Sequence, residues 1–386
     1  MLKKTKILIY FFQIIMYQIL SLIQSINVNI NSTISLFFSL ILIYCILSQR
    51  NNKRIINFNI VIITSCIGDA LLSFMHIISN IEIIYTDHYS YYTINGVLGK
   101  FSLTSKNIFF VIFIFTYCQY FCYFSLSISL FYKFMFLCKN EKYNRKLLFQ
   151  YIILIILIAL LLSVIKIFIL YAATKEPHEN INKYYLNEQQ KINTNTLSFN
   201  RKHYGFIIQE IFVLIFIIIS FFTIIIFGIL VTKKLNKKNI KKSGKTVDLR
   251  NKMKSVILMQ MISAFIFTII PVFLTSLYFF TSLYFSSLGH IILIMTSYLP
   301  LSNIIIHIFF TYDYKYRVLQ LIFPNKHINK RKRYKAITEI FKFFFLATNV
   351  CYSNQDGKLS YQKRKTRKLL HVKSNGFVQS EYSSYL

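Results

Sequence analysis

Long apolar stretches recur along the chain and alternate with shorter polar ones. Seven of them lie at residues 33–49, 55–80, 108–137, 147–172, 205–232, 255–280 and 286–312. A helix needs about 20 apolar residues to cross the hydrocarbon core of a bilayer, and most of these stretches supply that length. Because 55% of the chain is hydrophobic, a soluble fold would have to bury an improbably long apolar repeat. The pattern predicts an all-α membrane protein, a bundle of seven transmembrane helices.

The basic residues are distributed unevenly between the polar connections. The connections 49–54, 138–147 and 233–254, with the tail 313–386, hold 33 of the 45 Lys and Arg residues. The alternate connections carry few, and basic residues near helix ends are retained on the cytoplasmic side. We therefore expect the first of the seven helices to start outside and the carboxyl terminus to lie inside. The formal net charge of +32 is then a topological asymmetry, and we expect no nucleic-acid partner.

Residues 1–26 leave two alternatives open. Three lysines lie among the first six residues, and an apolar run follows at 7–26, a pattern typical of a signal peptide or of a retained signal-anchor helix. The run is slightly longer than a usual signal core, and Ile23 replaces the small residue expected two positions before a cleavage point near Ser25. Asn31 begins a glycosylation sequon on the outer face, but it abuts the membrane.

Three residues inside the apolar stretches are costly or disruptive in a membrane helix. Asp69 lies near the middle of the second stretch, where a carboxylate costs about 2.5–3.5 kcal/mol on insertion scales. Pro271 and Pro300 lie inside the sixth and seventh stretches, where each frees a backbone carbonyl and introduces a kink. We interpret Asp69 as part of a switch or ion site and the prolines as pivots. The alternatives are an Asp held by hydroxyl groups and static bends.

Together these features resemble a rhodopsin-like G-protein-coupled receptor. Phe265 and Pro271 match the outer positions of that family's Phe-x-x-Cys-Trp-x-Pro switch, and residues 128–133 overlay the end of its third helix. Tyr132 stands in place of the family's arginine, although Lys133 supplies a neighbouring cation. The resemblance implies that Asp69 occupies the family's sodium-linked position.

The chain is also similar to nematode serpentine chemoreceptors. This similarity rests on the seventh-helix run 297–303, which ends at Asn303, and on the aromatic and basic exit at 314–317. It covers about residues 33–322. It implies a small-molecule or odorant ligand and a heterotrimeric G protein as partners. The residues assigned to the switch are Asp69, Tyr132, Lys133, Phe265, Pro271, Pro300 and Asn303.

Four polar residues lie at depths that suit a ligand entering from outside. They are His76, Gln119, Glu210 and His290. Glu210 is the most persuasive, because a carboxylate in an apolar stretch is expected to face the bundle interior or a water-filled cavity. The alternatives are an interfacial Glu210 and histidines that serve packing. Lys166 is expected to snorkel to the membrane surface.

The inner segments predict further partners. Ten basic residues at 233–254 suit a G-protein contact, and we assign that contact to Lys233, Lys234, Arg250 and Lys254. Anionic lipid is the alternative partner, since each basic residue near such a surface contributes about 1 kcal/mol. Residues 313–350 are expected to form amphipathic helices on the membrane surface and 351–386 a basic, disordered tail. The tail ends at Leu386 in the form of a ligand for a PDZ domain.

The sequence carries no enzyme signature and implies no cofactor, since it contains no P-loop, Gly-rich nucleotide turn or clustered metal-ligand spacing. Two other membrane classes remain as alternatives: a secondary transporter with eight helices, and a chemosensory ion channel of inverted orientation. A receptor would lie in the plasma membrane as a multi-pass protein, with a sensory cilium as the narrower expectation.

Overall fold

A computed structural model describes residues 2–48, 53–85, 89–134, 145–174, 195–200, 203–237, 244–281, 287–310, 317–318 and 321. The chain divides into two units, Met1–Val318 and Leu319–Leu386. The expected surface helices at 313–350 and the tail at 351–386, with its terminal Leu386, lie almost wholly outside the described residues. The fold below is that of the first unit.

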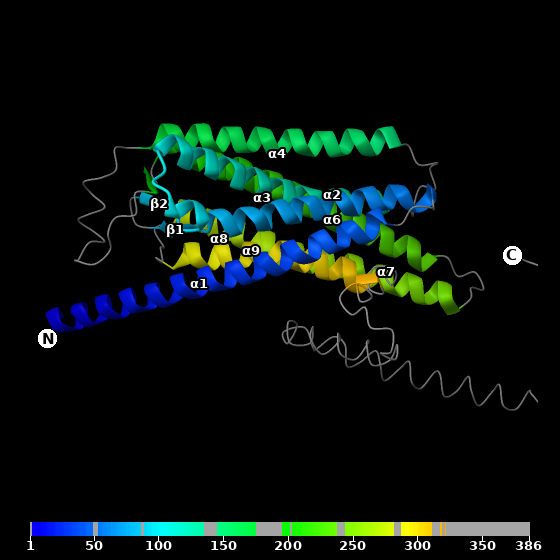
Figure 1. The fold of residues 1–386 in the computed structure, drawn as a ribbon, viewed down its shortest axis with the longest axis horizontal. Helices are drawn as coiled ribbons and strands as arrows, with labels where there is room; N and C mark the ends of the chain where they lie inside the picture. The colour runs from blue at the N-terminus through cyan, green and yellow to red at the C-terminus, as the bar shows by residue number, and fades with distance from the viewer. Residues whose placement is uncertain are drawn as a thin grey trace, which may run out of the picture. The chain divides into compact units, whose positions relative to one another are not determined.

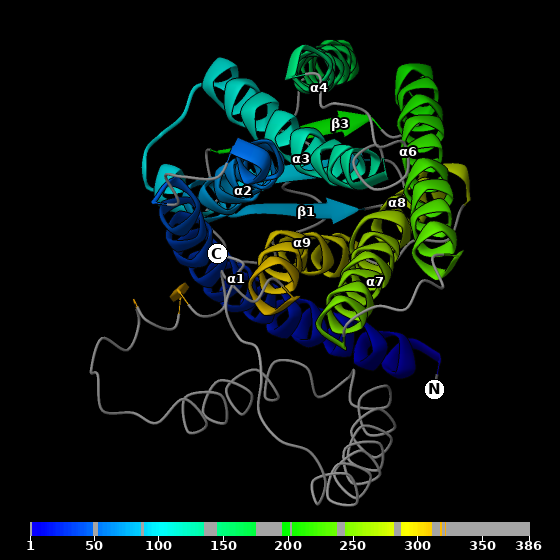
Figure 2. The same cartoon turned by 90° about the vertical axis from the view of Figure 1, so that its right-hand side faces the viewer.

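Helices run side by side through this unit (Figures 1 and 2). Their bounds are α1 Leu2–Leu47, α2 Lys53–Ser79, α3 Ser105–Phe134, α4 Arg145–Ala173, α6 Tyr204–Lys237, α7 Gly244–Ala264, η3 Phe265–Ile269, α8 Ile270–Phe280 and α9 Leu288–Phe310. Within the described part of the chain, seven spans are long and apolar enough to cross a membrane, and α7, η3 and α8 together form one of them. The seven-helix prediction is confirmed.

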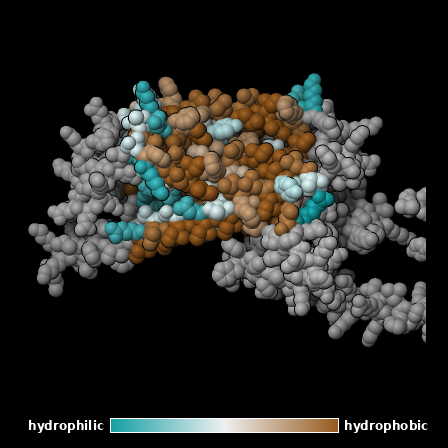
Figure 3. Space-filling model, viewed as in Figure 1, coloured by the Kyte–Doolittle hydropathy of each residue, from teal (hydrophilic) through white to brown (hydrophobic). Residues whose placement is uncertain are grey.

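The surface of these spans is apolar over the middle of the bundle (Figure 3). On α4, for example, Phe168 is 73% exposed and Leu157 is 54% exposed. Side chains of this kind are stable when they face lipid, and a contiguous apolar surface of this size is rare on a soluble monomer. Hydrophilic side chains gather toward the two ends of the bundle in the same view.

The first helix differs from the expectation. The sequence separates the apolar runs 7–26 and 33–49, whereas α1 is one unbroken helix from Leu2 to Leu47. The polar stretch between the runs contains no Pro or Gly, and its Asn31 amide donates to Asn27 Oδ1, one turn earlier, at 2.6 Å. Helical hydrogen bonds therefore continue through it. No separate N-terminal helix appears among the described residues.

A small sheet lies at one end of the bundle and was missed by the all-α prediction. Its strands are β1 Ile81–Tyr85, β2 Tyr89–Ile94 and β3 Thr196–Asn200, antiparallel in the order β1-β2-β3. Asn80, at φ 35°, turns the chain from α2 directly into β1, and Asn tolerates this left-handed conformation. The connections 81–107 and 173–204, interpreted as loops, thus meet in one sheet (Figure 2).

Hydroxyl pairs link neighbouring helices inside the bundle. Ser73 on α2 donates to Ser35 on α1 at 2.9 Å, and the hydroxyls of Ser263 on α7 and Ser302 on α9 lie 2.6 Å apart. In lipid there is little hydrophobic drive between helices, so small residues and interhelical hydrogen bonds hold such bundles together. Each bond contributes about 0.6 kcal/mol on average.

Candidate functional site

A buried junction of three helices forms around Asp69. The carboxylate is 0% exposed, and its Oδ1 accepts hydrogen bonds from the Cys122 thiol of α3 and the Asn303 amide of α9, each at 3.1 Å. Asn303 lies three residues after Pro300, the proline inside α9. The junction therefore joins the middle of α2 to the kinked part of α9.

The same junction contains oxygen atoms without a hydrogen-bond partner among the described residues. They are Asp69 Oδ2, Asn303 Oδ1 and the hydroxyl of Ser65, which lies one helical turn before Asp69. Carboxylate and carbonyl oxygens suit hard cations. The oxygen atoms at this junction are therefore chemically suitable ligands for the predicted sodium ion. The described residues contain no cluster of three or more His, Cys, Asp or Glu side chains able to hold a metal ion.

The sixth span changes its helical pitch beside its proline. Residues Phe265–Ile269 form a π-helical turn, closed by a hydrogen bond from the Ile270 N–H to the Phe265 carbonyl, and Pro271 follows at the start of α8. π-Turns of this kind are frequently found at functional sites. Phe265 itself is 47% exposed on the outside of the helix, with its ring 5.7 Å from that of Phe221 on α6.

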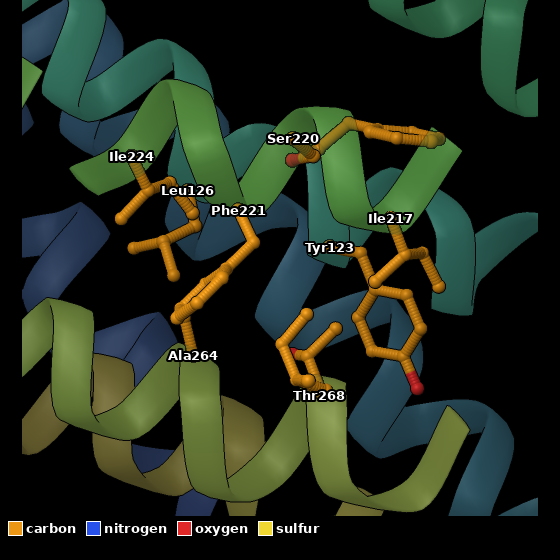
Figure 4. Close-up of a pocket in the computed structure, with 10 residues that line it drawn as sticks. Tyr123, Leu126, Ile217, Ser220, Phe221, Ile224, Ala264 and Thr268 are labelled. Carbon is orange, nitrogen blue, oxygen red and sulfur yellow. The ribbon is translucent and has the colours of Figure 1, made fainter. Parts of the chain in front are cut away.

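A narrow pocket lies against this π-turn, between α3, α6 and the sixth span (Figure 4). Its lining residues are Tyr123, Phe124, Leu126, Ile217, Ser220, Phe221, Ile224, Ala264, Thr268 and Ile269. In the close-up, Phe221 reaches from α6 toward Ala264, and the Tyr123 ring lies beside Ile217. The cavity volume is about 10 Å³, roughly the room that one water molecule needs. The helices are thus closely packed here.

Glu210 lies among polar groups near the sheet. It is 7% exposed on α6 and interacts electrostatically with Lys166 of α4 and with Tyr85 and Tyr92 of the sheet. Burial, more than any neighbouring charge, raises the pKa of Tyr85 and Tyr92 well above the usual range for tyrosine. Their hydroxyls therefore stay protonated and can act as hydrogen-bond donors.

Tyr278 of α8 completes this group. Its ring centroid lies 4.1 Å from that of Tyr85, and its hydroxyl lies 3.2 Å from Ser90 Oγ on β2. The sheet, α6 and α8 of the sixth span thus meet at Glu210. We call Glu210, Lys166, Tyr85, Tyr92 and Tyr278 the outer tyrosine cluster, after the orientation that the sequence predicts.

The other residues predicted for ligand binding lie elsewhere. His76 is 2% exposed, and its ring packs edge-on against Phe115 with centroids 5.0 Å apart. Gln119 donates to the Tyr123 hydroxyl at 2.7 Å, which places it next to the narrow pocket. His290 is 0% exposed and bonds to Gln24 on α1. The structure therefore does not bring the four predicted residues together in one site.

The end of the bundle that carries the predicted G-protein contact is only partly described. Lys233 is exposed near the end of α6, and Lys254 is half-buried on α7. The predicted residues whose side chains lie outside the described part are Tyr132, Lys133, Lys234 and Arg250. Their helical backbone places them on α3, α6 and α7.

The sequence analysis missed most of the outer tyrosine cluster. The three tyrosines come from segments that were interpreted as a connection and a transmembrane helix, so their convergence depends on the sheet. One signal was available: Lys166 and Glu210 are opposite charges inside consecutive apolar stretches. The expectation that Lys166 snorkels did not consider a partner on α6.

Comparison with known proteins identifies one family. The family described as "Serpentine type 7TM GPCR chemoreceptor Srd" matches residues 24–368 of the 386-residue chain. The match covers six of the seven spans completely and most of the first. No curated protein matches the chain.

Proposed function

We propose that this chain, which belongs to the serpentine type 7TM GPCR chemoreceptor Srd family, converts the binding of an external small molecule into activation of a heterotrimeric G protein. The family comprises nematode seven-transmembrane receptors, which are not enzymes. The transporter and ion-channel alternatives therefore lose their support. A chemosensory role implies placement in the plasma membrane, with the sensory cilium as the narrower proposal.

The observation that carries this proposal is the Asp69 junction. One buried carboxylate bonds to α3 and α9, and its α9 partner follows the helix-kinking Pro300. Interiors are closely packed and respond to a perturbation by exchanging one discrete packing for another. A ligand that favours one of these packings shifts the equilibrium between them.

On the outer side, we assign the ligand to the outer tyrosine cluster. A carboxylate beside protonated hydroxyls and aromatic rings is the arrangement that orients a small, partly polar molecule in an apolar site. The cluster includes Tyr278 of α8, which follows the π-turn and Pro271 in the same span. Ligand contacts with Tyr278 would act directly on the kinked sixth span. His76, Gln119 and His290 are not assigned to ligand contact.

On the inner side, we assign the G-protein contact to the basic ends of α6 and α7, which carry Lys233 and Lys254. Anionic lipid would bind to the same surface, and each partner would be favoured by the local positive charge. Sodium at Asp69 and a PDZ protein at Leu386 remain further proposals.

The test is a ligand screen with matched variants. Cells that express the receptor and a panel of G-protein reporters are exposed to volatile and water-soluble small molecules. For each active compound we expect Glu210→Gln to raise the half-maximal concentration at least tenfold. The control Ile211→Val changes a 41% exposed neighbour on the same helical turn and should leave the dose-response curve unchanged.

The outcomes separate the parts of the proposal. Equal dose-response curves for Glu210→Gln and the native receptor would show that the ligand does not bind at the outer tyrosine cluster. A receptor that reaches the cell surface, binds compounds and changes no G-protein reporter would contradict G-protein coupling.

A further inference from the structure

The outward part of α1 takes part in a polar cluster with the sheet and α9. Ser21 donates to Glu82 Oε1 of β1 at 3.1 Å, and Gln24 Nε2 donates to the Ile81 carbonyl at 3.0 Å. His290 Nδ1, on the first turn of α9, bonds to Gln24 Oε1. Three elements that are far apart in the sequence therefore meet through a few side chains.

The directions of these hydrogen bonds are fixed by chemistry. A backbone carbonyl can only accept, so the Gln24 amide nitrogen faces Ile81 and its oxygen faces His290. His290 Nδ1 must then be the donor. His290 Nε2 lies 3.7 Å from Glu82 Oε1, and Glu82 Oε2 accepts from Asn95 at 2.6 Å. The roles of the Gln24 amide and of His290 Nδ1 are therefore defined.

Burial and close packing distinguish this cluster from an incidental surface contact. Gln24 is 2% exposed and His290 is 0% exposed. Gly289, next to His290, lies so close to β1 that an added Cβ would overlap the Ile83 carbonyl. The β1 backbone can approach the start of α9 only because residue 289 has no side chain.

We propose that Ser21, Gln24, Glu82 and His290 form an outer lock that holds the start of α9 against α1 and the sheet, and that opening this lock favours the active packing. The regulatory part rests on the proposed receptor function, whereas the contact itself does not. His290 and Asn303 lie 13 residues apart on α9, about 20 Å along the helix. A shift of the outer end of α9 therefore reaches the Asp69 junction.

The lock also gives residues 21–25 a role. The sequence analysis placed them in a segment that is either a signal peptide or an anchor, with a cleavage point near Ser25. Cleavage there would remove both Ser21 and Gln24. The lock requires that these residues remain attached to the folded receptor.

The contact is tested with the double variant Ser21→Cys/Glu82→Cys. A protease site inserted in the connection at 49–52 separates α1 from the rest of the chain, so only crosslinked halves migrate together on a non-reducing gel. We expect a disulfide to form under mild oxidation and to open with reductant. The control pair Leu22→Cys/Glu82→Cys uses the adjacent residue, which is 62% exposed. It should crosslink far less.

Regulation is tested in the same preparation by nucleotide exchange on a panel of G proteins without added ligand. We expect exchange to fall when the disulfide closes and to recover when it is reduced. Gln24→Leu removes both hydrogen bonds of the Gln24 side chain and should raise ligand-independent exchange about eightfold, the shift that corresponds to losing two membrane hydrogen bonds of average strength.

Each result has a distinct meaning. Equal crosslinking by the two cysteine pairs would overturn the lock, and this conclusion would not depend on whether the receptor couples to a G protein. A specific crosslink that leaves exchange unchanged, while Asp69→Asn alters it, would overturn the regulatory part. Absence of exchange in every variant would count against G-protein coupling. The crosslinking gel would still test the contact between α1 and β1.

Discussion

The contact between Asp69 and Asn303 gives the sharpest prediction, because it can be measured as a coupling energy. Asp69→Asn keeps an oxygen that can accept from Cys122 and Asn303 but removes the negative charge. Asn303→Ala removes the amide donor on α9. If the two side chains act on each other, the effect of the double variant will differ from the sum of the single effects.

The expected size follows from the setting of the bond. Hydrogen bonds to charged groups contribute roughly 1.5–3 kcal/mol, against about 0.5–1.5 kcal/mol for neutral ones. Interhelical bonds in a membrane average about 0.6 kcal/mol and reach about 1.7 kcal/mol, because the unfolded state in lipid also finds partners. Because Asp69→Asn keeps a neutral acceptor for Asn303, the cycle measures the difference between the charged and the neutral bond. We therefore expect a coupling of about 1–1.5 kcal/mol, a change of about fivefold to thirteenfold in the equilibrium between packings.

The assay is ligand-independent nucleotide exchange, normalised to the amount of receptor at the cell surface. A control cycle combines Asp69→Asn with Ser163→Ala on α4, where the Ser163 hydroxyl donates to the Ala159 carbonyl of its own helix. That cycle should be additive within about 0.3–0.5 kcal/mol. Additivity of the Asp69 and Asn303 changes within the same limit would refute the junction as a coupled switch and leave Asp69 as a packed residue.

Three further predictions test separate parts of the structure. Gly289→Ala should lower the melting temperature by roughly 2–10 °C, because the added methyl group meets rigid backbone. In the control Gly228→Ala the methyl group meets a flexible methionine side chain, so the melting temperature should change little. Lys166→Met should reduce surface expression by leaving the Glu210 charge without its cation, and adding Glu210→Gln should restore part of the loss; no restoration would argue against the pair. An epitope placed after Leu386 should bind antibody only in permeabilised cells, and staining of intact cells would contradict the predicted orientation.

The seven spans were predictable because each is a local property of the chain. A run of about 20 apolar residues must be helical in lipid, where every backbone group has to be satisfied within its own segment. The importance of Asp69 was equally visible, since a carboxylate inside such a run needs partners. Its partner Asn303 was named only because the run 297–303 resembles a receptor family. Which faces of two helices point toward each other cannot be read from one sequence.

The sheet and the outer lock were not predictable for the opposite reason. β1 and β2 could be inferred as a hairpin, but β3 joins them from about 100 residues later, and no local signal specifies that pairing. Glu82 lies in a stretch that was interpreted as a connection between helices, and Gln24 lies in a run that was interpreted as a signal peptide or a signal anchor. Only the approach of α9 through Gly289 gives these two residues a common partner.

The arrangement of contacts explains why we expect α9 to couple the two ends of the bundle. In the apolar stretch of α9, 72% of the residues are buried inside the protein, against 22% in that of α4. A movement of α9 therefore requires its side chains to exchange protein partners, whereas α4 has mostly lipid-facing contacts to change. Along α9 the described partners come in order: Gln24 at His290, Ser263 at Ser302 and Asp69 at Asn303. The last two lie immediately beyond Pro300, where a kinked helix bends most easily. We therefore expect a displacement that begins at the sheet to be transmitted as a change of hydrogen-bond partners rather than lost in the lipid.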